Sequence, residues 1–332
     1  MSAITRRRLP VGVQSFVEIR KRGYLYVDKT ESIWNLVNGV KYNYLSRPRR
    51  FGKSVLVDTL QAYFEGRRDL FEGLSIMELE HDWAKHPVIR LDMSGAGAAS
   101  ESVRSYLDYI FNYYESIYEI KPRPNASLAV RFMAIISTAY RQTGQQVVIL
   151  IDEYDSPLQH SWLTPEHEAC TVIYREVFAV LKMADEMERF VFITGITKFT
   201  QISLFSVLNN ISNISFEPQF ATICGISKQE VVDNFMPEIK QMAEFNKWTT
   251  DETLNKLKDY YDGYHFCRHN MVDVYNPFSL INALYYKDLR SYWASSGATS
   301  LLSKFVNDME LHLDDFDHCS ILRGILETSD VT

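Results

Sequence analysis

The chain has 332 residues, of which 46% are hydrophobic and 13% aromatic, so it can bury a sizeable core and is long enough for two domains of roughly 150 residues each. This composition excludes intrinsic disorder, and 14 glycines with 10 prolines exclude a fibrous or low-complexity chain. The 35 Lys and Arg residues against 42 Asp and Glu give a net charge of −7, which argues against a broadly basic nucleic-acid binder while leaving a local basic patch open.

Cysteine spacing and hydropathy indicate the compartment. The four cysteines are far apart and form no C-x-x-C pair, so neither a disulfide scaffold nor a zinc ribbon is indicated. The basic start MSAITRRRLP is not followed by the apolar stretch that a signal peptide needs. The longest clean apolar run is VVILI at 147–151, far short of the roughly 20 residues of a membrane helix. We therefore expect a soluble, cytoplasmic chain with no membrane partner.

The first part of the chain alternates short buried strands with helices. Apolar runs of four to six residues alternating with helical periodicity favour a mostly parallel sheet covered by helices on both faces. Ser127 and Gly144 are typical of the two ends of a helix between them. The predicted strands are 42–46, 88–92, 147–151 and 190–194, and the predicted helices are 55–64, 101–119, 127–142 and 169–187.

The pattern changes near Gly225, because helical segments dominate beyond it and no further buried strand is evident. The predicted helices in this part are 227–235, 237–246, 251–261 and 277–286. Asn276 and Pro277 suit the N-cap and first position of the last one. The sequence therefore predicts a core of residues 1–225 and a helical domain of residues 226–332.

The sharpest motif is SRPRRFGKSVL at 46–56, which follows a strand and opens a helix. Gly52 would let successive backbone N–H groups face an anion, and the helix adds its positive end. Lys53 would reach the β- and γ-phosphates of a nucleotide, and Ser54 would offer its hydroxyl to Mg²⁺. A basic loop before an ordinary helix is the simpler alternative. The loop residues expected to bind the nucleotide are Arg47, Pro48, Arg49, Arg50, Phe51, Gly52, Lys53, Ser54 and Val55.

The strand VVILI ends in the acidic segment DEYDS, the second piece that a phosphate-loop fold needs. Asp152 at the strand tip would hold Mg²⁺ through water, and Glu153 would polarise the attacking water as a general base. An adjacent Glu favours a hydrolase over a pure nucleotide switch. We interpret Asp155 as a carboxylate of the surface turn before Pro157.

A polar residue also stands at the end of the last strand, in FVFITGITKF at 190–199. Thr194 would hydrogen-bond the γ-phosphate or the attacking water, although a hydroxyl that satisfies strand-end backbone is an alternative. Lys198 is a weaker candidate for sensing the γ-phosphate. The interval between Ser54 and Asp152 holds the extra strand 88–92, a feature of the ATPase branch with an added strand beside the phosphate-loop strand.

With these motifs in place, the chain resembles the bacterial AAA-ATPase-like family, whose members often carry a C-terminal PD-(D/E)XK nuclease domain. An Arg at position 47, where the usual G-x-x-x-x-G-K-[ST] pattern has Gly, is normal for that family. The resemblance implies a three-layer α/β P-loop NTPase core of the additional-strand branch plus a C-terminal helical domain, with ATP and Mg²⁺ bound. The nuclease domain would begin beyond the resembling segments. These segments are LPVGVQSFVEIRKRGYLYVDKT at 9–30, LSRPRRFGKSVL at 45–56, AYFEGRRDLFEGL at 62–74, VVILIDEYDSPL at 147–158, FITGITKFTQISLFSVLNNISNIS at 192–215, YYDGYHF at 260–266, VYNPFSL at 274–280 and YWASSG at 292–297.

The function predicted from these features is an Mg-dependent, ATP-hydrolysing regulatory module of an AAA-like or STAND-like ATPase. Nucleotide state would move a helical lid, with residues 261–266 close to the nucleotide. A nucleotide-binding interaction module with little hydrolysis is one alternative. The ATPase part of a nucleic-acid-processing system without its nuclease is another. Besides ATP, the sequence leaves open a protein partner or a homo-oligomer, and also a nucleic acid, which the net charge does not indicate.

Overall fold

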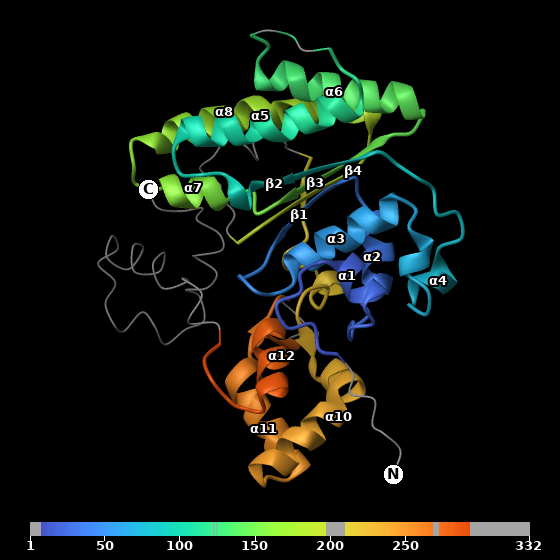
Figure 1. The fold of residues 1–332 in the computed structure, drawn as a ribbon, viewed down its shortest axis with the longest axis vertical. Helices are drawn as coiled ribbons and strands as arrows, with labels where there is room; N and C mark the ends of the chain where they lie inside the picture. The colour runs from blue at the N-terminus through green and yellow to red at the C-terminus, as the bar shows by residue number, and fades with distance from the viewer. Residues whose placement is uncertain (1–7, 122, 124, 197–209, 268–271, 293–332) are drawn as a thin grey trace.

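The computed structural model describes residues 8–121, 123, 125–196, 210–267 and 272–292. A central sheet carries helices on both faces, and a separate group of helices lies beyond one end of it (Figure 1). Among the described residues, no helix combines the length and the apolar character needed to cross a membrane.

The central sheet has five parallel strands in the order β2–β3–β4–β1–β5. All four predicted strands form, and β5 is a further strand of two residues. The strand next to β1 is β4, so the expectation that 88–92 is the strand added beside the phosphate-loop strand is wrong. Apolar runs reveal that a strand is buried, but strand order depends on contacts far apart in sequence. The strands are β1 (Tyr42–Ser46), β2 (Val88–Asp92), β3 (Val147–Asp152), β4 (Glu188–Gly195) and β5 (Ser212–Asn213).

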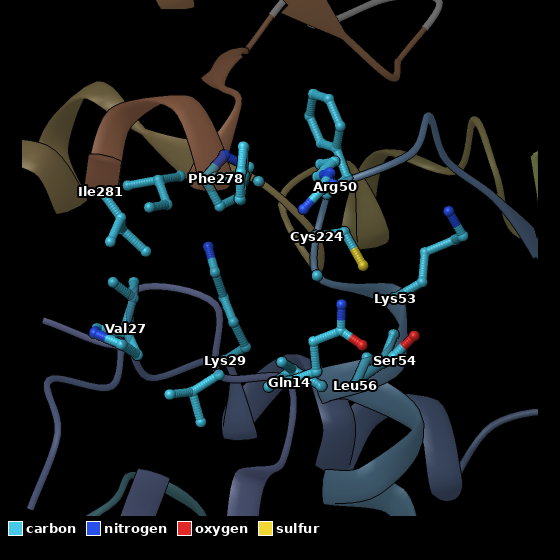
Figure 2. A pocket seen from close by; sticks show the side chains of 18 of the residues that line it. Gln14, Val27, Lys29, Arg50, Lys53, Ser54, Leu56, Cys224, Phe278 and Ile281 are labelled. Atoms are coloured by element: carbon cyan, nitrogen blue, oxygen red, sulfur yellow. The ribbon is translucent and has the colours of Figure 1, made fainter. Parts of the chain in front are cut away.

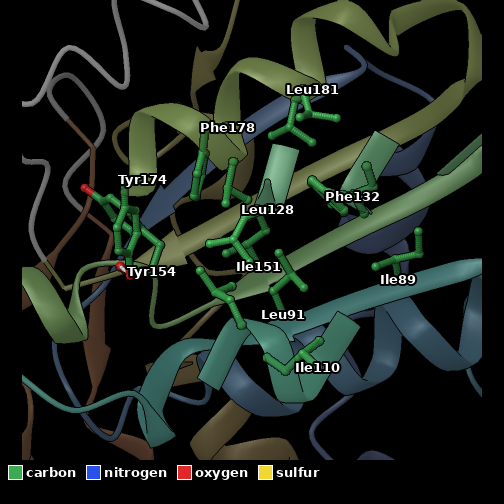
Figure 3. Packing of buried hydrophobic residues seen from close by; sticks show 14 of the residues in the cluster. Ile89, Leu91, Ile110, Leu128, Phe132, Ile151, Tyr154, Tyr174, Phe178 and Leu181 are labelled. Atoms are coloured by element: carbon green, nitrogen blue, oxygen red, sulfur yellow. Dashed lines mark hydrogen bonds between the residues drawn. The ribbon is translucent and has the colours of Figure 1, made fainter. Parts of the chain in front are cut away.

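Strand β3 shows why the core forms on both faces of the sheet. Its six residues are buried, and successive side chains point to opposite faces. Ile149 and Ile151 pack with the outer helices in one cluster, seen in Figure 3, while Val148 and Leu150 pack in another with the helix that follows β1. Helices α5, α6 and α8 cover the first face, and α1 to α4 cover the second (Figure 1).

The predicted helices of the core form with ends shifted by a few residues. Ser127 accepts a hydrogen bond from the Val130 amide as N-cap, and Gly144 ends the same helix with a φ of 67°. The α-helices are α1 (Phe16–Lys21), α2 (Thr30–Val37), α3 (Lys53–Phe64), α4 (Ile76–Leu79), α5 (Ser100–Ile117), α6 (Leu128–Thr143), α7 (Ser156–Ser161) and α8 (Glu166–Met183). The 3₁₀ turns are η1 (Arg68–Leu70), η2 (Met93–Gly95), η3 (Asp185–Met187) and η4 (Pro218–Phe220).

The helical part contains α10, α11 and α12, and it departs from expectation in two ways. The segments 227–235 and 237–246 form one helix with Pro237 inside it, because burial of its apolar face outweighs one lost hydrogen bond. Three short strands form an antiparallel sheet, too brief to leave a periodic signal. The elements are α10 (Lys228–Asn246), α11 (Thr250–Tyr261), α12 (Pro277–Tyr286), β6 (Ile226–Ser227), β7 (Tyr264–His265) and β8 (Asp273–Tyr275).

A third core cluster joins the helical part to the beginning of the chain. Leu9 is buried among residues of α10, α11 and α12, including Phe235, and Leu25 packs against the same cluster. The Lys29 ammonium donates to both carboxylate oxygens of Glu230, the N3 residue of α10, at 2.5 and 2.7 Å. Residues from the chain start therefore complete the helical part, and the division at residue 225 stays a prediction.

Candidate functional site

The candidate site lies at the carboxyl edge of the sheet, where β1, β3 and β4 end side by side. Ser46 of β1 is opposite Gly195 of β4, and Ile151 of β3 is opposite Ile193. The loop after β1 leads into α3, so its residues lie above the tips of the neighbouring strands. Ligands of open α/β sheets bind at this edge.

The loop after β1 has the backbone of a phosphate-binding turn. Gly52 is the N-cap of α3 with a φ of +85°, and a Cβ placed there would meet nothing within 4 Å. Only glycine adopts this conformation readily. Gly52 has no side chain that could cap α3, and no side-chain cap hydrogen bond is present at this end among the described residues. The first N–H groups of α3 can therefore face an anion, which the positive end of the helix also favours.

Lys53 is buried with its ammonium inside the loop. Its Nζ donates to the carbonyl oxygens of Arg47 and Pro48 at 3.0 and 3.1 Å. Burial lowers the pKa of Lys53, and the nearby carboxylates Asp155, Asp152 and Glu153 oppose that shift. The lysine thus holds a positive charge in the loop with main-chain carbonyls as its hydrogen-bond partners.

The acidic pair at the end of β3 faces the same loop. Asp152 is 1% exposed, and its Oδ1 accepts a hydrogen bond from the Glu153 amide at 3.0 Å. Burial raises the pKa of Asp152, while a hydrogen bond from Ser54 and the charge of Lys53 lower it. The Ser54 hydroxyl therefore lies close to the Asp152 carboxylate.

Glu153 occupies an unusual backbone position. Its φ is +48°, a left-handed conformation that costs a non-glycine residue of order 1 kcal/mol and is often found at functional sites. The side chain is half-buried and lines the cavity beside the loop. Burial raises the pKa of this carboxyl, opposed by Lys53, and a raised pKa suits a group that accepts a proton near neutral pH.

Thr194 lies near the end of β4, between the tips of the other two strands. It is fully buried, and within the described part of the chain its Oγ1 has no hydrogen-bond partner. Leaving a buried hydroxyl unpaired costs about 1–3 kcal/mol. The alternative that this hydroxyl satisfies the strand-end backbone therefore finds no support in the structure.

The Arg47 side chain points away from the cavity. Its guanidinium donates to the carbonyls of Ser46, Ser215 and Phe220 at 2.7 to 3.0 Å and stacks over the Phe266 ring at 4.0 Å. Burial lowers the pKa of Arg47 to about 10. The structure therefore assigns the Arg47 side chain to packing, and only its carbonyl faces Lys53.

A cavity of about 450 Å³ opens beside the loop. Figure 2 shows Lys53 and Ser54 at one end of it and Val27 and Ile281 at the other. Its walls come from the loop with the start of α3, the N-terminal stretch and α12, together with Glu153, residues 223–226 and Phe235 of α10. The cationic residues that line it are Lys29, Arg49, Arg50 and Lys53, and the apolar ones include Pro10, Val13, Val27, Pro277, Phe278 and Ile281.

The helical part contacts the loop directly. The Phe51 ring lies 4.8 Å from the ring of Tyr264 and 5.5 Å from that of Phe266. The Arg50 guanidinium lies 4.2 Å from the centre of the Phe278 ring. A change in the conformation of this loop would therefore alter its contacts with β7 and with the start of α12.

Sequence reasoning missed several residues of the site. A smaller polar pocket of about 280 Å³ adjoins Ser54 and Glu153, and Asp58, Arg90 and Asp92 also line it. Asp92 carried a usable signal, because it ends an apolar strand as Asp152 does and is its partner in the sheet. Arg90 carried none, being a single polar residue inside a strand.

Asp155 is a correction to the sequence analysis, which placed it in a surface turn. It is 1% exposed, and its Oδ2 accepts hydrogen bonds from the Ile196 amide at 2.8 Å and Gln159 Nε2 at 2.6 Å. It therefore ties the end of β4 to α7. Lys198, the weaker candidate for sensing phosphate, lies outside the described residues.

The site's donors fit Mg²⁺ with a triphosphate. Mg²⁺ commonly takes one or two protein oxygens, with phosphate oxygens and water completing its shell. The adjoining Ser54 hydroxyl and Asp152 carboxylate supply oxygens of that kind. The described residues contain no group of three His, Cys, Asp or Glu side chains placed to hold a metal by themselves.

The parallel sheet, the glycine turn before α3 and the acidic end of β3 define a three-layer P-loop α/β fold. Residues 10–205 match the family described as Predicted AAA-ATPase, and the chain belongs to this family. It is also 32% identical over 303 residues to an uncharacterized protein in the vnfD 5′ region of Azotobacter chroococcum mcd 1. That match covers 90% of this chain and 56% of the relative, so the chain spans little more than half of the relative's length. No solved structure matches the chain.

Proposed function

We propose that the chain binds ATP with Mg²⁺ at the carboxyl edge of the sheet and hydrolyses its terminal phosphate bond. The observation that carries this proposal is the position of Lys53. Its buried ammonium is held by the carbonyls of its own loop, beside the unfilled glycine turn and the Ser54–Asp152 pair. When a nucleotide binds, the Lys53 ammonium would exchange these main-chain carbonyls for phosphate oxygens as its hydrogen-bond partners.

The cavity supports a nucleotide rather than a free phosphate. Its cationic end is formed by the loop, and its apolar end lies between the N-terminal stretch and α12. Val27 and Ile281 offer apolar surface to a purine base, and Phe278 adds an aromatic ring. A triphosphate on the loop with the base at the apolar end would contact the loop, the N-terminal stretch and α12 together.

The hydrolytic step follows from four side chains. Ser54 and Asp152 would hold Mg²⁺, which when bound neutralises charge on the phosphate oxygens. Glu153 would accept a proton from the attacking water, because it is half-buried with a pKa raised by burial. The Thr194 hydroxyl, which has no partner among the described residues, would orient that water or donate to the terminal phosphate.

A regulatory role is the final part of the proposal. Phe51 and Arg50 of the loop contact aromatic side chains of β7 and α12. A ligand that rearranges the loop would change these contacts, and such a difference between states is what a nucleotide switch requires. The helical part would then report whether the terminal phosphate is present.

Replacing Lys53 with Ala tests the binding step. Loss of one partner of a buried charge-assisted contact costs about 2–5 kcal/mol, so affinity for a fluorescent ATP analogue should fall about 30-fold or more. The matched control is Lys41→Ala, whose ammonium bonds Asp185 at the opposite edge of the sheet; its affinity should equal that of the wild type. Unchanged affinity in a folded Lys53→Ala variant would defeat the assignment.

A further inference from the structure

Arg90 lies within β2, and its guanidinium reaches both α3 and β3. Its Nη1 is 3.2 Å from Asp58 Oδ1 and 3.3 Å from Gln61 Oε1, both on α3. Its Nη2 is 3.8 Å from Asp152 Oδ2 on β3. The side chain is 22% exposed, so water screens these charges less than it would at the surface. Arg90 thus bridges a helix to the metal-site carboxylate.

The Asp152 carboxylate is held on both of its oxygens. Oδ1 accepts the Glu153 amide at 3.0 Å, and Oδ2 is the oxygen that faces Arg90. A carboxylate with one oxygen in a hydrogen bond and the other beside a cation is restrained in its rotation about the Cβ–Cγ bond. A carboxylate that binds a metal needs a fixed orientation, and that orientation is set by the residues that contact the carboxylate.

Arg90 itself has a rigid support. Asp58 uses its Oδ1 for Arg90, while its Oδ2 accepts from the Ser15 hydroxyl at 2.9 Å and the Val17 amide at 3.3 Å. Ser15 is the N-cap of α1, and the residues just before it line the nucleotide cavity. The contacts therefore run from the N-terminal stretch through α3 and β2 to Asp152.

We propose that Arg90 is a positioning residue that holds the Asp152 carboxylate in the orientation that serves Mg²⁺, with Asp58 anchoring Arg90. The proposal rests on the proposed ATP–Mg²⁺ function and adds a residue that acts through Asp152. The role depends on the size of the planar Arg90 guanidinium, which contacts α3 with one nitrogen and β3 with another. A lysine ammonium carries the same charge but spans a shorter distance.

Arg90→Lys separates positioning from charge. Binding of a fluorescent ATP analogue is measured at increasing Mg²⁺, and again in excess chelator. The Mg²⁺ concentration for half-maximal enhancement of binding should rise about tenfold, while affinity in chelator, which depends on the loop, should stay within about twofold of the wild type. Asp58→Asn, which leaves Arg90 in place but weakens its anchor, should shift the Mg²⁺ requirement in the same direction and by less.

The matched control is Arg131→Lys. Arg131 is 14% exposed and also joins two carboxylates, Asp108 and Glu115, but it lies on the outer helix α6. Its substitution should leave the Mg²⁺ requirement unchanged. An unchanged requirement in both Arg90→Lys and Asp58→Asn would overturn the positioning role while leaving nucleotide binding intact. Absence of nucleotide binding in the wild type would overturn the proposed function and the role of Arg90 together.

Discussion

A carboxylate is buried at each end of the parallel strands: Glu188 at the amino ends, called here the amino edge, and Asp152 at the carboxyl edge. The surroundings of these two carboxylates differ. At the amino edge, Glu188 begins β4 and is fully buried. Its Oε2 lies 2.6 Å from the Tyr42 hydroxyl, which is also 2.8 Å from Asp185 Oδ1. One hydroxyl proton cannot serve two carboxylates, so the cluster favours a protonated Glu188. Burial accordingly raises the pKa of Glu188 to about 8.

At the carboxyl edge, Asp152 has a hydroxyl, an amide and two cations around it. Ser54, Lys53 and Arg90 all lower its pKa against the effect of burial, and a cavity adjoins the group. Glu188 lines none of the pockets that adjoin the described site. A buried carboxylate alone is therefore no sign of a site; the surrounding cations and an adjoining cavity are what distinguish Asp152.

The largest expected effect is on the rate of ATP hydrolysis, and it tests whether the catalytic base lies at the carboxyl edge. Glu153→Gln keeps the size of the side chain and removes the base, so ATP hydrolysis should fall about 10²- to 10⁴-fold while binding persists. Steady-state phosphate release and binding of a fluorescent analogue measure the two quantities. Glu188→Gln, the same change at the amino edge, should leave turnover within about twofold. Hydrolysis at the wild-type rate by Glu153→Gln would place the base elsewhere.

The second prediction concerns pH and the amino edge. An unfolded glutamate ionises near 4.5, whereas folded Glu188 keeps its proton up to about pH 8. Between these values the folded chain binds more protons than the unfolded one. The free energy of unfolding should therefore fall as pH rises through this window, by on the order of 1 kcal/mol per pH unit.

Denaturant titrations of wild type and Glu188→Gln, compared from pH 5 to pH 8, isolate this contribution. The amide cannot ionise, so the stability difference between the two proteins should shift in favour of the variant as pH rises. Lys41 and Asp185 are present in both proteins and cancel in the comparison. A difference that does not change with pH would show that Glu188 ionises normally in the folded chain.

The third prediction uses the unpaired hydroxyl at the carboxyl edge. Thr194→Val keeps the side-chain shape and removes a buried group that has no partner in the described structure. Stability should rise by about 1 kcal/mol, while hydrolysis falls about tenfold. The control is Thr59→Val, because the buried Thr59 hydroxyl does donate to the Val55 carbonyl at 2.7 Å. That variant should lose stability, and a parallel loss in Thr194→Val would mean that its hydroxyl is paired.

The smallest expected effect asks whether the carboxyl edge communicates with the helical part. Hydrogen exchange with a non-hydrolysable ATP analogue should slow at β7 and the start of α12, because Phe51 and Arg50 contact both. The strand β4 near Glu188 should not respond. Protection confined to the α/β core would leave the helical part as a static binding domain.

Local chemistry explains what the sequence could predict. Apolar runs located the four main strands, and Asn276 with Pro277 located the start of α12, since both signals lie within a few residues. The phosphate loop and the Asp152–Glu153 pair depend on short motifs for the same reason. Burial of Asp155 and the packing of the Arg47 side chain away from the cavity depend on partners about 40 and 170 residues away. The bridge made by Arg90 joins three elements, so no local pattern could reveal it.

The third core cluster has a consequence for how the chain folds. Leu9 is synthesised long before the helices among which it packs, which extend to residue 286. Lys29 and Glu230, which form an ion pair, are separated by 201 positions. Contacts of such long range close late, because chain entropy opposes them until most of the polypeptide is present. The α/β core can begin to assemble during synthesis. Leu9, in contrast, is buried only after α12, the last described helix, has been synthesised.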